Sequence, residues 1–121
     1  MNISGKSVSL AYKAYIQPEG LSRVIVLHDS LSHKPLSVHP RLGGSANGHN
    51  GVSDVISRLQ GAAFHRIRIG IGRPQGAYHN YVLEKLEPRE LEYWGECGEG
   101  VEKVWSSIES ILVSNFSQQA V

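Results

Sequence analysis

A continuous apolar run, VIVL at residues 24–27, constrains the fold of this chain more than any other feature. The run contains β-branched residues and is followed at once by the polar pair His28 and Asp29. Short apolar runs of this kind are typical of strands that are covered on both faces, and such strands belong to α/β sheets. We therefore expect a covered strand over RVIVLHD (residues 23–29).

Two helices are predicted on either side of this strand. The segment SGKSVSLAYKAYI (residues 4–16) has apolar residues at helical spacing, and Ser4 is placed to cap it. The segment NGVSDVISRLQ (residues 50–60) predicts a second helix whose apolar side consists of Val52, Val55, Ile56 and Leu59.

Two further strands are predicted. SVHPRL (residues 37–42) indicates a short strand that Pro40 weakens. HRIRIGIG (residues 65–72) alternates charged and apolar residues, which is typical of a strand with one exposed face. Strands that alternate with helices predict an α/β domain, although about three strands are few for a sheet covered on both faces.

The C-terminal segment PRELEYWGECGEGVEKVWSSIESIL (residues 88–112) predicts one or two helices, interrupted near Gly95 to Gly100. We expect a buried stripe along it, formed by Trp94, Val101, Val104, Trp105, Ile108 and Leu112.

The charge balance narrows the classes of function. The 121 residues include 12 Lys and Arg and 11 Asp and Glu, which gives a net charge of +1. A strongly basic nucleic-acid-binding protein has a larger excess, so any polyanion has to be bound by a local cluster. No run of 18 apolar residues exists, and no membrane-spanning helix is expected.

Metal and cofactor sites are not predicted. The single cysteine, Cys97, excludes an intramolecular disulfide and a four-cysteine zinc site, and it fits a reducing compartment. The irregular spacing of His28, His33 and His39 differs from the close pairs of metal-binding histidines. SGKSV and IGIG are incomplete as phosphate-binding or dinucleotide-binding motifs, and no G-x-S-x-G elbow is present.

Two segments are candidate sites. Asp29 follows the covered strand at its carboxyl end, the edge where open α/β sheets bind ligands, so it either orients a histidine or caps a loop. LGGSANGHNG (residues 42–51) leads into a helix whose first N–H groups are free, with Arg41 before it and Arg66 and Arg68 on the next strand. That segment is either a phosphate-binding loop or a plain glycine-rich turn.

Five segments in this order resemble the bacterial-type peptidyl-tRNA hydrolase family: MNISGKSV, VIVLHDSL, RLGGSANGHNGVSDVISRL, FHRIRIGIGRP and YVLEKLEPRE. The resemblance runs from Met1 to about Glu92 and is looser in the C-terminal helix. It implies a single α/β domain over residues 1–121, with a mixed twisted sheet between helices. The implied activity is that of a carboxylic-ester hydrolase without metal or other cofactor. It cleaves the ester between a peptide and the 3′ ribose of tRNA and so recycles tRNA in translation (ribosome rescue).

The resemblance also implies roles for individual residues. Asp29 matches the aspartate that orients the catalytic histidine, and Asn2 matches an asparagine of the active-site cleft. The matching segment of the glycine-rich loop positions substrate through Gly48, His49 and Asn50, with Asn50 next to the scissile ester. Arg41 and Arg68 resemble the tRNA phosphate clamp of the family.

This chain departs from the family pattern at its start. The family begins with a strand, a GNPG turn and an RHN histidine that serves as general base, and none of these is in the sequence. Neither His28 nor His49 takes that part in the family. Ser30 and Ser32 replace acidic residues, and Asn47 replaces a glycine.

The resemblance therefore implies an N-terminally truncated domain that lacks strands of its sheet. The alternative to a truncated enzyme is a non-catalytic remnant of the family that binds tRNA or a protein. The family is monomeric, and an unpaired inner strand offers an edge for pairing with another chain. The expected compartment is the cytoplasm, or the mitochondrion if a targeting segment precedes Met1.

Overall fold

The computed structural model describes residues 3–17, 20–73 and 82–119. Helices and strands follow one another in this order: α1 (Gly5–Tyr15), the 3-10 helix η1 (Leu21–Arg23), β1 (Ile25–Ser30), β2 (Ser37–Leu42), α2 (Asn50–Leu59), β3 (His65–Gly70), α4 (Pro88–Trp94) and α5 (Glu99–Gln119). The predicted helices and strands are confirmed, and the tail forms two helices rather than one.

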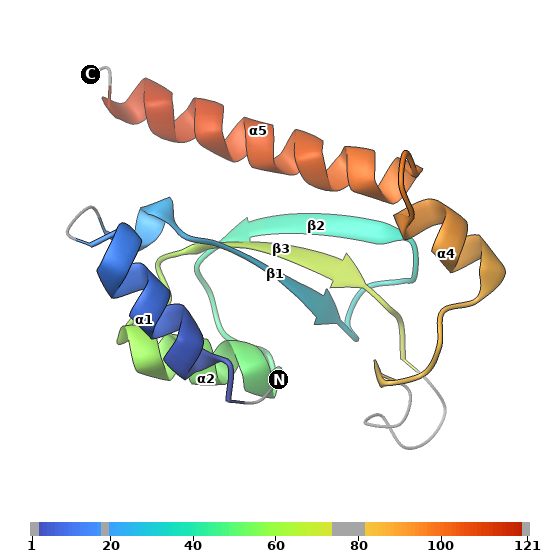
Figure 1. Ribbon diagram of the computed structural model, residues 1–121, viewed down its shortest axis with the longest axis horizontal. Coiled ribbons are helices and arrows are strands. Elements are labelled where there is room, and N and C mark those ends of the chain that lie inside the picture. Colours follow the sequence, from blue (N-terminus) through green and yellow to red (C-terminus); the bar gives the residue numbers. More distant parts are fainter. Residues whose placement is uncertain (1–2, 18–19, 74–81, 120–121) are drawn as a thin grey trace. The chain divides into compact units, whose positions relative to one another are not determined.

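The three strands form one sheet in the order β1-β3-β2 (Figure 1). The His65 amide donates to the Val24 carbonyl and the Ile71 amide to the Ser30 carbonyl, so β1 and β3 run parallel in constant register. The Gly43 amide donates to the Phe64 carbonyl, which joins the end of β2 to the start of β3 and makes this pair antiparallel. The predicted α/β fold with a mixed sheet is confirmed.

Strand β1 lies at one end of this strand order, and its predicted coverage on both faces is wrong for Leu27. The Leu27 side chain is 47% exposed. A strand with a neighbour on one side only has fewer side chains packed around it than a central strand. Among the described strand residues, an apolar side chain is fully buried at Ile67 of β3 instead, and Phe64 just before β3 is fully buried as well.

The exposed face predicted for β3 is also wrong at one position. Arg66 is only 3% exposed, although its alternation with Ile67 predicts opposite faces, one of them open to solvent. Arg66 and Ile67 are adjacent in the strand and point to opposite faces, and both are buried, so both faces of β3 are covered along this part. The partners of the buried guanidinium lie in the glycine-rich loop.

The chain forms two compact units. The α1–α2 unit consists of Met1–His28 and Arg41–Arg66, and the α4–α5 unit consists of Asp29–Pro40 and Ile67–Val121. Each strand contributes residues to both units.

In the α1–α2 unit the two helices pack side by side (Figure 1). Val52 and Val55 of α2 are buried there, as predicted, and Ile56 and Leu59 are half-buried. A Cβ atom on Gly5 would lie 2.5 Å from the Asp54 carbonyl oxygen, so only glycine permits this approach of α1 to α2.

The start of α1 is capped from α2. Ser4 occupies the N-cap position, but its side chain forms no capping hydrogen bond, and the expected cap is wrong in that respect. The Gly5 amide instead donates to Oδ2 of Asp54 at 2.7 Å. A carboxylate at this end satisfies a free amide and is favoured by the helix dipole.

In the α4–α5 unit, local signals set the helix ends. A capping box between Glu87 and Glu90 starts α4, with Pro88 at its first position. The chain turns between the helices through Cys97, whose φ is 63°, and the Gly98 amide donates to the Gly95 carbonyl at 2.9 Å. The break predicted near Gly95 to Gly100 is confirmed.

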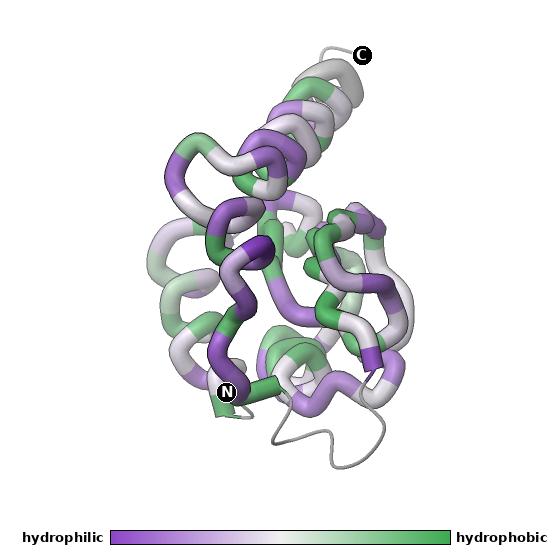
Figure 2. The backbone as a smooth tube through the Cα atoms, turned by 90° about the vertical axis from the view of Figure 1, so that its right-hand side faces the viewer, coloured by the Kyte–Doolittle hydropathy of each residue, from purple (hydrophilic) through white to green (hydrophobic). Residues whose placement is uncertain are grey.

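The stripe predicted along α5 is partly wrong. Trp105 is 58% exposed and Leu112 is also exposed, whereas Ile111 is buried and Val101, Val104 and Ile108 are half-buried. Adjacent helix positions differ by about 100°, so a shift by one residue moves a side chain off the buried side. Figure 2 shows hydrophobic and hydrophilic segments alternating along this helix.

Candidate functional site

The loop between β2 and α2 has a left-handed backbone at four positions. The φ angles are 71° at Gly43, 88° at Gly44, 54° at Asn47 and 85° at Gly48. Glycine adopts this region without steric cost, and asparagine tolerates it better than most residues. Gly43, Gly44 and Gly48 are thus required by the path of the chain from strand to helix.

Arg66 holds this loop from beneath. Its Nη2 donates to the Gly43 carbonyl at 3.1 Å and to the Ser45 carbonyl at 2.9 Å. A buried guanidinium needs such partners because an uncompensated buried charge is costly. The hydrogen bonds join the central strand to the loop and fix the loop backbone. Sequence reasoning placed Arg66 near the loop but did not count it as a site residue.

Arg41 lies against the same loop. A Cβ atom on Gly44 would approach within 2.5 Å of Nε, Cζ and Nη2 of Arg41, so the guanidinium folds over the glycine. Arg41 is exposed. A guanidinium carries five donors in a planar fork that fits two phosphate oxygens. This placement suits the anion-binding role expected of Arg41.

His49 caps helix α2. Its Nδ1 accepts a hydrogen bond from the Val52 amide at 3.0 Å. The accepting nitrogen has no proton, so in this arrangement the neutral ring carries its proton on Nε2. The ring also meets His28 of β1 edge to face, with centroids 4.9 Å apart. His49 is thereby a structural cap of α2.

Asn50 and Gly48 complete this loop. Asn50 is the first residue of α2 and is exposed, so its amide is open to a ligand. Gly48 is exposed and no heavy atom lies within 4 Å of a Cβ built on it. Arg41, Gly48, His49 and Asn50 thus all belong to the α1–α2 unit.

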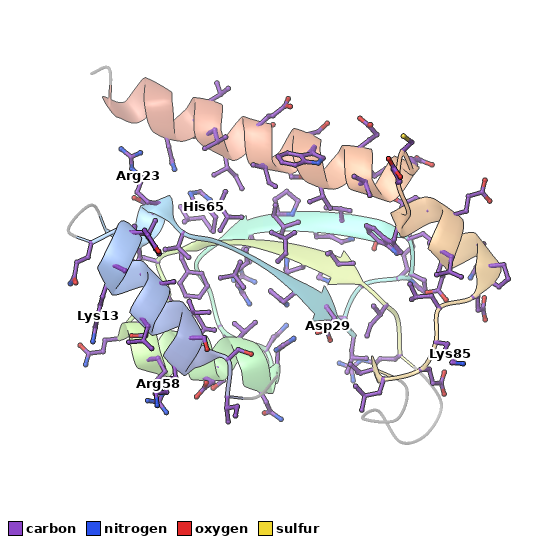
Figure 3. The ribbon with its side chains drawn as sticks, in the orientation of Figure 1. Lys13, Arg23, Asp29, Arg58, His65 and Lys85 are labelled. Atoms are coloured by element: carbon purple, nitrogen blue, oxygen red, sulfur yellow. The ribbon has the colours of Figure 1, made fainter. Side chains whose placement is uncertain are left out.

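The other predicted site residues lie elsewhere. Asp29 belongs to the α4–α5 unit and lies half-buried at the carboxyl end of β1, as expected (Figure 3). Arg68 is in the same unit and donates from Nε to the His39 carbonyl at 3.0 Å. Asn2 lies outside the described residues.

The hydrogen bond of Arg68 ends at His39, one of two histidines whose rings are stacked. The rings of His33 and His39 are 4.0 Å apart at an angle of 27°, and Ser30 Oγ lies 2.7 Å from Nδ1 of His33. Burial lowers the pKa of His39, and the charges of Arg68 and Lys34 lower it further. Burial, then His39 and Arg68, lower the pKa of His33 in the same way. The pair therefore favours neutral rings.

The sequence profile of the peptidyl-tRNA hydrolase family matches residues 1–120. This chain belongs to the peptidyl-tRNA hydrolase family. The match includes the loop built around Arg41 and Arg66 and extends through the C-terminal helix α5.

Individual peptidyl-tRNA hydrolases support the assignment. The chain is 38% identical over 120 residues to peptidyl-tRNA hydrolase of Alkaliphilus metalliredigens, covering 98% of this chain. It is 44% identical over 96 residues to that of Shewanella halifaxensis, covering 76% of this chain. The crystal structure of peptidyl-tRNA hydrolase from Acinetobacter baumannii superposes with a TM-score of 0.66 at 38% identity and covers 76% of this chain.

The chain spans about half the length of these relatives. It covers 62% of the Alkaliphilus metalliredigens protein, 48% of the Shewanella halifaxensis protein and 46% of the Acinetobacter baumannii chain. These matches establish the family and the fold of this chain.

A hollow of about 460 Å³ lies in the α4–α5 unit, and none of the residues that line it is one expected from the family. It is lined mainly by Arg89, Glu92, Tyr93, Glu96, Cys97 and Glu99. Its carboxylates disfavour a polyanion. In residues 3–17, 20–73 and 82–119, no cluster of histidine, cysteine or acidic side chains is arranged to hold a metal ion. None of the helices in these ranges has the length and apolar character needed to cross a bilayer.

Proposed function

We propose that this chain binds peptidyl-tRNA and supplies the substrate-positioning part of a site that hydrolyses the ester between peptide and tRNA, so that the tRNA returns to translation. The observation that carries the proposal is the loop of residues 43–49. Arg66 holds its backbone from the interior, and Arg41 lies over Gly44 at its surface. A preorganised loop loses less conformational freedom on binding than a mobile one.

Each described residue that the family resemblance singles out near the substrate has a proposed part. Arg41 contacts a phosphate near the 3′ end of the tRNA, and by the family resemblance Arg68 also has a phosphate-binding part. Asn50 presents an amide from the first position of α2, where it donates to or accepts from the ester or a bound water. Gly48 leaves room for the substrate, and His49 holds the helix start in place.

Hydrolysis adds water across the ester, giving a free peptide carboxylate and the tRNA 3′ hydroxyl. A general base has to take a proton from the attacking water. Asp29 has the role of orienting that base. By the family resemblance the base is a histidine of an RHN segment that precedes the residues matched by Met1. Asn2 and Asn50 are amides and cannot replace it.

A second function, tRNA binding without cleavage by these 121 residues, is favoured by the state of His49. Its Nδ1 accepts from the Val52 amide, and Nε2 then carries the ring proton. Neither nitrogen is free to take a proton from water while the cap is kept. Loss of a general base typically slows a reaction by about 10²–10⁴-fold.

The test uses the 121-residue chain with peptidyl-tRNA and follows ester cleavage and tRNA binding in the same samples. We expect Arg41→Ala to weaken binding roughly tenfold because a charge-assisted contact is lost. Lys85→Ala removes an exposed cation of the α4–α5 unit and serves as the matched control.

The outcomes separate the two functions. Cleavage that disappears in Asn50→Ala supports a hydrolase within these residues. Binding without cleavage, weakened by Arg41→Ala, supports the binding function. Equal affinity of Arg41→Ala, Lys85→Ala and the unchanged chain contradicts the role of the loop in both.

A further inference from the structure

Strand β1 lacks the features by which the edge strands of sheets are usually protected. It lies at one end of the order β1-β3-β2, so among the described strands it has a neighbour on one side only (Figure 1). Edge strands are commonly kept from pairing by proline, lysine or a β-bulge. The segment Ile25–His28 contains no proline, no lysine and no acidic residue. We call the side of Ile25–His28 that faces away from β3 the β1 edge.

The ladder between β1 and β3 shows that β1 has no bulge. The carbonyls of Val24 and Ser30, six residues apart, accept from two β3-side amides that are also six residues apart. In a parallel ladder alternate residues of a strand face the same neighbour, so the even-numbered residues of β1 face β3. The amides and carbonyls of Ile25 and Leu27 therefore point to the β1 edge. An added strand can form hydrogen bonds with these groups.

Apolar side chains accompany these backbone groups. Leu27 is 47% exposed, although it belongs to the apolar run VIVL. Ile25 is half-buried and lies on the same face of the strand as Leu27, because side chains alternate between the two faces. A straight apolar edge strand of this kind is a template for pairing with another strand.

Strand β2, at the other end of the sheet order, is protected by its sequence. It contains Pro40, which has no amide hydrogen, and the exposed Arg41 follows. Proline is confined to edge strands, where it hinders further pairing. Pairing of β1 with β2 of another molecule would repeat without closing and build a fibre. Pro40 disfavours that arrangement, which leaves β1 with β1 as the pairing that closes.

We propose that two copies of this 121-residue chain pair through their β1 edges, antiparallel and about a two-fold axis. In the register centred on Val26, Ile25 lies opposite Leu27 of the second copy. Arg23 then lies opposite Asp29 of the second copy, and their opposite charges favour this register. Registers centred on Ile25 or on Leu27 place a charged residue opposite an apolar one.

This register makes use of both properties of the edge. The pairs of Ile25 and Leu27 exchange about four backbone hydrogen bonds across the axis and cover the exposed leucine side chains. Val26 lies opposite its own copy in a non-hydrogen-bonded pair, where side chains approach most closely. The two sheets join into one, and the run VIVL lies in its interior. That position agrees with the continuous apolar pattern of the run, which is typical of interior strands.

Sedimentation equilibrium of the 121-residue chain over a range of concentrations measures the association. The test variant is Leu27→Lys, which places a cation on the β1 edge at an exposed side chain. The matched control is Leu10→Lys, the same substitution at a leucine of α1 that is 61% exposed. Thermal unfolding of each variant verifies that it is folded.

We expect the mean mass of the unchanged chain to rise with concentration from that of one chain toward that of two. Leu27→Lys should weaken the association roughly tenfold or more, because lysine is a natural guard of edge strands and the apolar contact is lost. Leu10→Lys should associate like the unchanged chain.

A cross-link tests the register and does not depend on the folding of Leu27→Lys. The exposed Cys97 is first replaced by serine. Val26→Cys then places two thiols opposite each other across the axis, and oxidised glutathione converts them into a disulfide. Leu27→Cys is the control, because Ile25 of the second copy lies opposite it. We expect a disulfide-linked dimer on a non-reducing gel for Val26→Cys and several-fold less for Leu27→Cys.

Three results overturn the pairing: a chain that stays monomeric at every concentration, equal association of Leu27→Lys and Leu10→Lys, or cross-linking of Leu27→Cys that equals that of Val26→Cys. A monomeric chain would leave the β1 edge to a strand of a different polypeptide, the rival occupant. The proposed function is judged separately, by peptidyl-tRNA and the Arg41→Ala and Asn50→Ala variants. None of the residues substituted for the pairing test lies in the loop of residues 43–49.

Discussion

The two compact units are built by different kinds of contact. In the α1–α2 unit, hydrogen bonds join residues far apart in sequence, as between Gly5 and Asp54, 49 residues apart, and Arg66 and Gly43, 23 residues apart. In the α4–α5 unit, the helix ends are set by neighbours, such as Glu87 and Glu90. In the first unit the start of α1 and the glycine-rich loop thus depend on distant residues. In the second unit the helix ends depend on neighbours, while its strand residues also form distant hydrogen bonds, such as that of Arg68 to the His39 carbonyl, 29 residues apart.

The distant contacts of the α1–α2 unit explain how the loop of residues 43–49 keeps its conformation. The loop of residues 43–49 has a backbone that few residues adopt, and a buried arginine is needed to fix it. The α4–α5 unit instead exposes large side chains such as Trp105. Substitutions of similar size should therefore have unequal effects in the two units.

The largest effect is expected for Phe64→Ala. Phe64 is completely buried at the start of β3, and loss of a buried aromatic side chain costs about 3–5 kcal/mol. Trp105→Ala in α5 is the matched aromatic control and should cost less than about 1 kcal/mol because the side chain is largely exposed. Urea unfolding of both variants measures the free energies. Similar losses in both would refute the contrast between the units.

The next effect concerns Arg66 and is visible in binding as well as in stability. Arg66→Ala leaves two loop carbonyls without their donor, and we expect a loss of about 2–3 kcal/mol in the free energy of unfolding. The loop also loses its support, so tRNA affinity should fall even at temperatures where the variant is fully folded.

Arg66→Lys separates the effect of the planar guanidinium donors from the effect of the positive charge. Lysine keeps the positive charge but lacks the planar arrangement of donors, so it should restore part of the stability and less of the tRNA affinity. Unfolding by urea and tRNA binding are measured on the same preparations. If tRNA affinity falls in proportion to the free energy of unfolding in both variants, Arg66 acts only on stability and has no separate effect on the loop.

Regular elements were predictable where one pattern decides them. Helix α2 follows from apolar residues at three- and four-residue spacing, and Val52 and Val55 are buried as that spacing predicts. Strand β2 was predictable despite Pro40. The buried side of α5 was not, since Ile111 and Leu112 are both apolar and only tertiary packing selects between them.

The loop was predictable as a location but not as a mechanism. Four glycines, Arg41 and Asn50 in sequence predict a ligand-binding segment, and the structure confirms only the loop itself. The burial of Arg66 depends on the loop that packs over it, which contacts it from 21 to 23 residues away in the sequence. The cap by His49 was unpredictable as well, because Ser, Thr, Asp and Asn are the usual N-cap residues. Substrate roles for Asp29, Arg68 and Asn2 stay predictions.

A smaller effect tests the contact between α1 and α2. Gly5→Ala places a Cβ atom 2.5 Å from the Asp54 carbonyl oxygen, which forces the helices apart at that point. We expect a loss of about 1–3 kcal/mol in thermal or urea unfolding. Ser7→Ala, at an exposed position of the same helix, is the control with little effect. A neutral Gly5→Ala would mean that the start of α1 moves without cost.

The smallest effect is a pH dependence of stability from the stacked pair His33 and His39. Burial lowers the pKa of both rings below the ordinary 6.5, and Arg68 adds repulsion. Below pH 6.5 the unfolded chain takes up protons that the folded chain resists. The contribution of the pair is therefore complete above pH 6.5 and declines as pH falls toward the folded pKa values. Urea unfolding between pH 7.5 and pH 5, a range chosen about 6.5, measures this loss.

The variant His39→Phe isolates the contribution of the stacked pair to the pH dependence of stability. It keeps an aromatic ring against His33 but removes one titrating group and the repulsion it exerts on its neighbour. Stability should then fall less steeply with acid, because only His33 of the pair still resists a proton. The comparison is between slopes against pH, so a constant change in packing energy cancels. If the slope of stability against pH is identical to that of the unchanged chain, the acid sensitivity belongs to other groups and the stacked pair does not contribute to it.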